Sequence, residues 1–155
     1  MVGLGAGVGA NHPPRIKRRD TGQAMSEENV DRAYRVLDAV NTRDLDALLE
    51  LMDENVESVS RIVAMEGGLH GHDGVRRWWK SWFDAFPDYQ LEVVEMRDRG
   101  DFVVATLRAV GHGAGSDLPF EDNIFQASRW LDGRCIWWQV FTSQVEALEA
   151  GGLSE

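Results

Sequence analysis

The most regular hydrophobic pattern in the chain runs over residues 73–86. Its apolar side chains recur every three or four positions, at Val75, Trp78, Trp79, Trp82, Phe83 and Phe86. This spacing predicts an α-helix with one apolar stripe. Because each aromatic side chain can bury about 150–250 Å², the stripe needs a broad apolar partner, and the strand-rich residues 91–141 offer one. We therefore expect this helix to lie in the hollow of a curved sheet, with either a filled core or a small-molecule pocket between them.

The remaining pattern predicts helices early in the chain and strands late. Residues 26–41 repeat apolar positions at helical spacing after Ser26, and Asp44 is placed to cap a second helix that reaches Met52. Strand patterns cover residues 56–63, 90–97, 102–110, 120–130 and 135–142, followed by a tail over 143–150 that forms a short helix or frays. Asp132-Gly133 predicts a tight hairpin. Short turns between consecutive strands imply an antiparallel meander, and the grouping is typical of an α+β fold.

The first residues do not share these patterns. A glycine-rich start, Pro13-Pro14 and a basic cluster follow neither a helical nor a strand period. Met25 followed by Ser26 reads like a natural start. We expect residues 1–24 to be a disordered extension and residues 25–153 to form one domain.

The charge of the chain narrows its partners. The formal net charge is −10, which argues against nucleic acid because Lys and Arg supply the affinity for phosphates. No apolar run approaches the ~20 residues that a membrane span requires. The single cysteine, Cys135, cannot form an internal disulfide. We therefore expect a cytoplasmic protein with no nucleic-acid or membrane partner.

Several local phrases occur in a characteristic order. They are Asn41-Thr42-Arg43-Asp44-Leu45-Asp46-Ala47-Leu48, Gly71-His72-Asp73-Gly74-Val75-Arg76-Arg77-Trp78-Trp79, Phe86-Pro87-Asp88-Tyr89, Leu131-Asp132-Gly133-Arg134-Cys135-Ile136 and Glu146-Ala147-Leu148. Together they resemble the SnoaL-like group of the nuclear transport factor 2-like superfamily, which includes ketosteroid isomerase-like and polyketide cyclase-like proteins. The resemblance covers roughly residues 26–153.

The resemblance implies a cone-shaped α+β barrel. Three helices from the N-terminal half would pack in the concavity of a curved, mostly antiparallel sheet, around an apolar pocket. It also implies a homodimer through the outer face of the sheet. By the same resemblance, Trp137, Gln139 and Phe141 look inward on the last strand, which leaves Ile136, Trp138 and Val140 outside. We interpret that outer set as an oligomer contact.

The group includes polyketide cyclases, ketosteroid isomerases and epoxide hydrolases, so the fold does not decide the activity. Ketosteroid isomerases need a carboxylate base and two acidic donors. By the resemblance their tyrosine falls at Val36, their base at Ser60 and their second acid at Gln126. None of these side chains can do that acid–base work, which disfavours steroid isomerisation. The catalytic residues stay unknown, with Gln126 and the loop residue His112 as weak candidates.

A set of residues is expected to contact a ligand in the pocket. They are Ser60, Trp79, Phe83, Gln126, Trp137, Gln139 and Phe141. The two glutamine amides would orient a ligand carbonyl or hydroxyl, or each would bond sheet backbone or water instead. Glu121 and Asp122 precede the same strand core, where a catalytic carboxylate is less expected than an exposed edge charge.

His70 and His72 flank Gly71 and could bind a metal ion, but the sequence places no third ligand. We expect solvated histidines, no metal and no cofactor. The functional expectation is a SnoaL-like protein whose apolar pocket binds a small hydrophobic molecule. Whether it is an enzyme of the cyclase, isomerase or hydrolase kind stays open. The alternative is a non-catalytic interaction or structural module of the same fold with a filled pocket.

Overall fold

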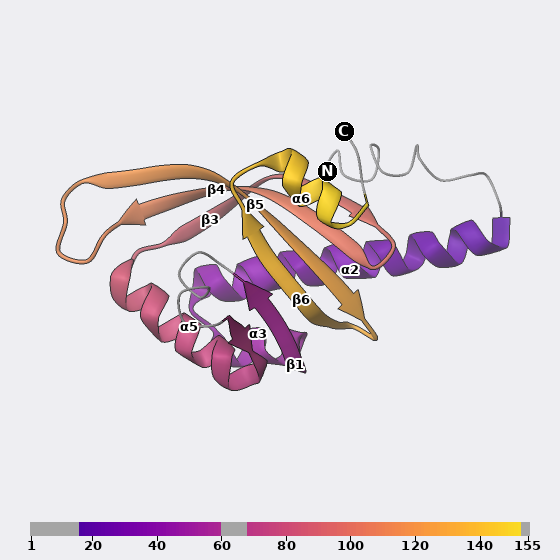
Figure 1. Cartoon of the computed structure of the whole chain (residues 1–155), viewed down its shortest axis with the longest axis horizontal. Coiled ribbons are helices and arrows are strands. Elements are labelled where there is room, and N and C mark those ends of the chain that lie inside the picture. Colours follow the sequence, from indigo (N-terminus) through magenta and orange to yellow (C-terminus); the bar gives the residue numbers. More distant parts are fainter. Residues whose placement is uncertain (1–15, 60–67, 153–155) are drawn as a thin grey trace.

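The computed structural model describes residues 16–59 and 68–152 of the chain (Figure 1). Within these residues the elements follow in the order α2 (Ile16–Thr42), α3 (Leu45–Leu51), β1 (Met52–Val59), β2 (Leu69–His70), α5 (Gly71–Ala85), β3 (Gln90–Arg99), β4 (Phe102–His112), β5 (Pro119–Leu131), β6 (Arg134–Phe141) and α6 (Gln144–Ala150). The predicted grouping of helices before the meander strands is confirmed. None of the described helices is both long enough and apolar enough to cross a membrane.

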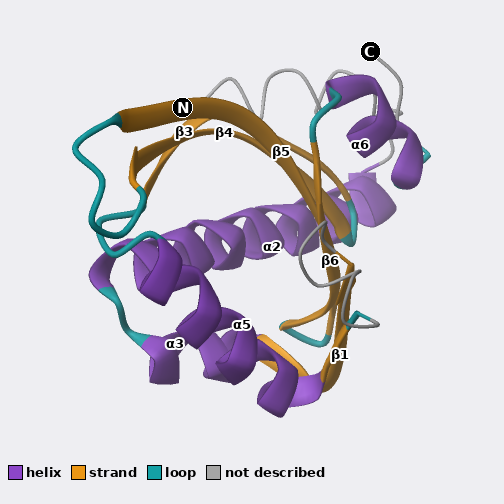
Figure 2. Ribbon diagram, turned by 60° about the vertical axis from the view of Figure 1, so that its left-hand side comes forward, coloured by secondary structure: helices purple, strands orange, loops and turns teal. Residues whose placement is uncertain are grey.

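The strands form one bent sheet with the order β2-β1-β6-β5-β4-β3. β1 runs parallel to β6, and the other neighbouring pairs are antiparallel. Figure 2 shows α2 lying in the hollow of the sheet, with α3 and α5 on the open side. The predicted cone-shaped α+β architecture is therefore confirmed, although the described sheet keeps β2 and β3 as edges and does not close into a barrel.

The hairpin between β5 and β6 follows the predicted turn. Asp132 and Gly133 both adopt left-handed backbone angles, with φ of 52° and 84°. This is the combination that a two-residue hairpin requires, and Asp-Gly tolerates it better than most pairs. The turn sets Leu131 opposite Arg134 and Trp130 opposite Cys135.

A bulge directly after this turn reverses the predicted face of β6. The register shifts between Arg129 and Trp130, so that Arg129 pairs with Trp137 rather than with Ile136. One extra residue in a strand sends every later side chain to the opposite face. Trp138 accordingly lies in the inner core beneath α2, and Trp137 packs on the outer side. The expectation that the Trp137 face looks inward is wrong.

The convex face of the sheet carries its own small core. α6 lies across it (Figure 2), and its Ala147 and Leu148 are buried against Phe102, Val104 and Ala127. Ser143 caps this helix, since its hydroxyl accepts the backbone N–H of Glu146. The outer patch predicted from Ile136, Trp138 and Val140 is therefore wrong, because Trp138 and Val140 pack into the inner core. The homodimer itself stays a prediction.

Two boundaries differ from the sequence-based prediction. α2 begins at Ile16 rather than at Ser26, and residues 1–15 lie outside the described residues. Helix formers such as Lys17, Arg18 and Gln23, with no proline between Pro14 and the end of the helix, allow the helix to extend in this direction. β1 covers Met52–Val59 rather than 56–63, and the rest of that predicted strand lies outside the described residues.

Candidate functional site

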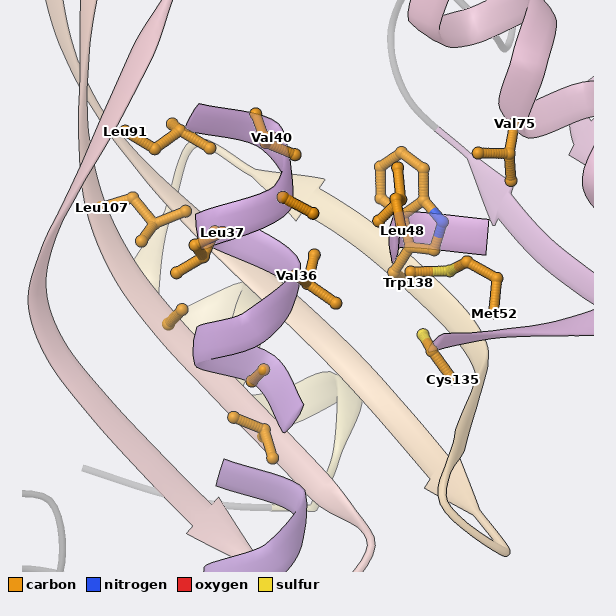
Figure 3. Close-up of a cluster of buried hydrophobic side chains, with 14 of the residues drawn as sticks. Val36, Leu37, Val40, Leu48, Met52, Val75, Leu91, Leu107, Cys135 and Trp138 are labelled. Atoms are coloured by element: carbon orange, nitrogen blue, oxygen red, sulfur yellow. The ribbon is translucent and has the colours of Figure 1, made fainter. Parts of the chain in front are cut away.

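A cavity of about 780 Å³ lies between the helices and the concave face of the sheet. Its walls come from α2, α3, α5, strands β1 and β3 to β6, and the first turn of α6. The lining residues are Val36, Leu37, Val40, Leu48, Met52, Val75, Trp78, Trp82, Phe86, Tyr89, Leu91, Ala109, Phe120, Asp122, Ile124, Gln126, Trp138, Gln139, Val140, Phe141, Thr142 and Glu146. Most of these side chains are apolar, and Figure 3 shows several of the deepest ones on α2 and around Trp138.

The aromatic stripe of α5 divides between two environments. Val75, Trp78, Trp82 and Phe86 line the cavity, at spacings of three and four residues that keep them on one side of the helix. Trp79 and Phe83, both expected to contact a ligand, are absent from this lining and pack edge to face against each other at 4.7 Å between ring centroids. The Phe83 ring instead receives the Arg43 guanidinium, 4.0 Å from its centroid. The helix was correctly predicted, but its orientation about its own axis was not.

The sheet contributes one amide to the middle of the cavity. Gln126 lies on the concave face of β5 and pairs with Val140 across the β5–β6 ladder. Within the described residues its side chain makes no hydrogen bond, so its amide is available to another molecule. Gln139 and Phe141 also border the cavity, although they alternate along β6 with the inward Trp138 and Val140, and Phe141 packs against the convex core. Trp137 does not border the cavity and stacks on Phe102 instead.

Positions carried over from the resemblance have mixed outcomes. Val36 and Gln126 both line the cavity. Ser60, the third such position and a predicted ligand contact, lies outside the described residues.

Two residues of the cavity were not predicted to belong to it. Tyr89 is buried and lines the cavity, and burial raises the pKa of its phenol to about 12, with the charge of Asp122 adding to the effect. The phenol therefore stays protonated at neutral pH and can donate a hydrogen bond. Asp122 lines the same cavity from β5 but is solvent-exposed, which places it at the mouth. Asp122, Ile124 and Gln126 occupy every second position along β5. This spacing, which places the three side chains on one face of the strand, was the signal in the sequence for Asp122.

Two indole N–H groups at the cavity lack partners. The Nε1 atoms of Trp82 and Trp138 are buried and make no hydrogen bond within the described residues. Trp138 is only 6% exposed. A buried donor without an acceptor is costly, typically by ~1–3 kcal/mol. Both indoles line the cavity, so an acceptor on a bound molecule would remove that cost.

His112, the second weak catalytic candidate, lies away from this cavity. Its ring Nδ1 is 2.7 Å from Asp88 Oδ2, and its backbone N–H donates to Asp88 Oδ1 at 2.8 Å. These bonds lower the pKa of the Asp88 carboxyl. The pair ties the loop after β4 to the segment that follows α5, outside the lining of the cavity.

The histidines around Gly71 diverge. His70 lies 3.7 Å from Glu57 on the exposed side of β1, and His72 Nε2 is 2.9 Å from the carbonyl oxygen of Met52. No group of three potential metal ligands occurs in the part of the chain that the structure describes.

The cavity as a whole is a largely apolar chamber with an amide, a phenol, two indole donors and carboxylates near its mouth.

A family model and a solved structure point to the same family. The model of the SnoaL-like domain matches residues 33–138. A SnoaL-like protein from Jannaschia, described as a candidate polyketide cyclase, has 19% identity and a TM-score of 0.69 over 84% of this chain and 90% of its own. No curated protein matches the chain in sequence.

Two further solved structures share the fold. A ketosteroid isomerase-like protein from Catenulispora acidiphila, in complex with trimethylamine, has 18% identity and a TM-score of 0.66 over 79% of this chain and 93% of its own. IdmH, a candidate polyketide cyclase from Streptomyces antibioticus, has 23% identity and a TM-score of 0.64 over 81% and 99%. At these identities the likeness establishes the fold alone.

Proposed function

This chain belongs to the SnoaL-like domain family, and we propose that it binds a small hydrophobic molecule in the cavity between α5 and the concave face of the sheet. The cavity is the observation that carries the proposal. Its volume of about 780 Å³ falls within the ~300–1,000 Å³ range of small-molecule sites. An apolar chamber with a few convergent polar groups is also the usual composition of such a site.

The same observation weighs against a filled interior. In a protein that used this fold only as a scaffold, the tryptophans of α5 would close the hollow by packing on the sheet. Trp78 does contact Trp138, with ring centroids 5.5 Å apart. The space beyond this contact nevertheless remains open toward Phe86, Phe120 and Ile124.

Titration with a neutral hydrophobic dye tests the proposal. N-phenyl-1-naphthylamine should bind with a saturable rise in its fluorescence and raise the melting temperature of the protein. Ala109 lines the cavity and is 3% exposed, so Ala109→Phe should occupy part of the space and weaken binding by about tenfold or more.

The matched control places the same ring outside the cavity. Val94 is 63% exposed on β3, so Val94→Phe should leave the affinity unchanged. A dye that does not saturate, or that loses equal affinity in both variants, would contradict binding in this cavity. Circular dichroism and the melting temperature of each variant identify a loss of fold.

Proton-transfer catalysis in the same cavity is a second candidate function. Asp122 and Tyr89 line one chamber, and the charge of Asp122 adds to the burial that raises the pKa of the phenol. A carboxylate can accept a proton from carbon next to a carbonyl, while a protonated phenol or the Gln126 amide stabilises the resulting enolate oxygen.

Deuterium exchange measures this activity without knowledge of the natural substrate. The hydrophobic ketone 2-tetralone, incubated with the protein in D₂O, should gain deuterium next to its carbonyl faster than in buffer. Asp122→Asn should remove the acceleration because the amide is not a base. Exchange that is equal with and without protein would leave binding as the function of the cavity.

A further inference from the structure

We propose that the mouth of the cavity selects hydrophobic molecules that carry a protonated amine and disfavours those that carry a carboxylate. The inference rests on the proposed binding function and names the class of ligand. It concerns the charge at one end of the molecule, which neither the family nor the fold determines.

The charges on the cavity wall are all of one sign. Asp122 from β5 and Glu146 from α6 line the cavity, and its described lining contains no Lys, Arg or His. Neither carboxylate belongs to an ion pair within the described residues, whereas Glu121 beside Asp122 pairs with Arg108 at 2.9 Å. These unpaired carboxylates would therefore repel an anionic ligand as it enters, and they would attract a cationic one.

A cluster of aromatic rings lines the same cavity as Asp122 and reaches β5 at Phe120. Phe120 precedes it by two residues on the same face of β5 and lies 5.2 Å from Phe86 and 6.2 Å from Tyr89 between ring centroids. Trp82 lies 4.9 Å from Phe86 and 5.2 Å from Tyr89. The faces of such rings attract cations, most strongly where water is excluded. Aromatic rings beside a carboxylate are the set of groups that recognises an ammonium ion.

The deep part of the cavity supplies an independent observation, two buried donors that a bound molecule could satisfy. Trp138 lies in the group of buried side chains that includes Leu48 and Met52 (Figure 3), and its indole N–H has no acceptor in the described structure. The Trp82 N–H is in the same state. An N–H donor does not bind a cation. The charged end of a ligand therefore belongs at the mouth, and its apolar body belongs inside.

Three probes of nearly equal size separate charge from hydrophobicity. 4-Phenylbutylamine is a cation near neutral pH, 4-phenylbutanol is neutral and 4-phenylbutanoate is an anion. Their dissociation constants are measured by calorimetry at physiological ionic strength, since screening there suppresses long-range attraction. We expect the amine to bind about tenfold more tightly than the alcohol, and the carboxylate to bind more weakly than either.

Two variants assign the preference to the site. Asp122→Asn keeps the shape of the side chain and should bring the amine close to the affinity of the alcohol. Glu149→Gln removes the same charge from the exposed side of α6, outside the cavity lining, and should keep the preference. A preference that is equally reduced in both variants would reflect the overall charge of −10 and would overturn the assignment.

The remaining outcomes distinguish this inference from the function on which it rests. Equal binding of the three probes would overturn the charge selection and leave small-molecule binding intact. Tighter binding of the carboxylate would also overturn it. No binding of any probe or of the neutral dye would contradict the proposed function, and the inference would fall with it.

Discussion

The two faces of the sheet are built from alternate residues of the same strands, yet they pack in opposite ways. On the convex face, Phe102 is 1% exposed, stacks on Trp137 and lies under α6. On the concave face, Phe120 and Ile124 are half-buried because they border open space. The convex side of the meander thus contributes stability through close packing, and the concave side gives up part of that stability to keep a chamber.

Substituting one phenylalanine on each face should give the largest effect. Phe102→Ala removes a fully buried ring and should lower the free energy of unfolding by ~3–5 kcal/mol. Phe120→Ala removes a half-buried ring and should cost less, roughly 1–2 kcal/mol. Chemical denaturation gives both values, and dye titration should show weaker binding for Phe120→Ala alone. Equal costs would mean that the two faces are packed alike.

The docking of α6 can be disrupted by a single methyl group. Gly151 follows this helix with φ of −104°, which any residue adopts, but a Cβ at this position would overlap the Phe102 ring. Gly151→Ala should therefore cost ~1–3 kcal/mol through overpacking. Denaturant titration measures the loss, and dye affinity at low temperature should persist. An unchanged stability would show that α6 moves freely over the convex face.

The Asp88–His112 pair outside the cavity should give the smallest effect, visible as a dependence of stability on pH. Because the bonds from His112 hold the pKa of Asp88 below its unfolded value of about 3.9, the pair stabilises the fold above that pH. This contribution is lost as the pH falls through the lowered pKa. The melting temperature of the protein should exceed that of Asp88→Asn near neutral pH, and the difference should shrink in acid.

A charge-matched substitution isolates this pair. Asp117 is an exposed aspartate on the loop that follows His112. Asp117→Asn should follow the melting temperature of the unmodified protein at every pH. A constant difference between the protein and Asp88→Asn from neutral to acid pH would rule out the bond as its cause.

Much of the fold follows from local signals. The α5 stripe predicted a helix, and the Asp132-Gly133 turn predicted a hairpin. These features depend on residues close together in the chain, and there the spacing of apolar side chains predicts the element directly. The site was predicted less completely. Gln126, Gln139 and Phe141 border the cavity, whereas Trp79, Phe83 and Trp137 do not.

Each of these errors has a tertiary origin. An unbulged Asp132-Gly133 hairpin would set Gln126 opposite Gln139, and Trp137 would then share its inward face. The bulge at Ile136 instead sets Gln126 opposite Val140 and turns Trp138 inward. No local pattern marks this bulge, because an insertion of one residue changes the pairing without changing the strand propensity. Likewise, the orientation of α5 about its own axis depends on a contact between residues far apart in the chain. Phe83 packs against Arg43, which directly follows α2.

The sequence by itself thus determined which segments are helices and strands and which consecutive strands pair. Only the tertiary structure decided which of two adjacent tryptophans faces the chamber, and that Tyr89 and Asp122 line the same cavity. The physical reason is that periodicity defines two faces for each element but does not orient them. Their orientation depends on register and on contacts between residues far apart in the chain.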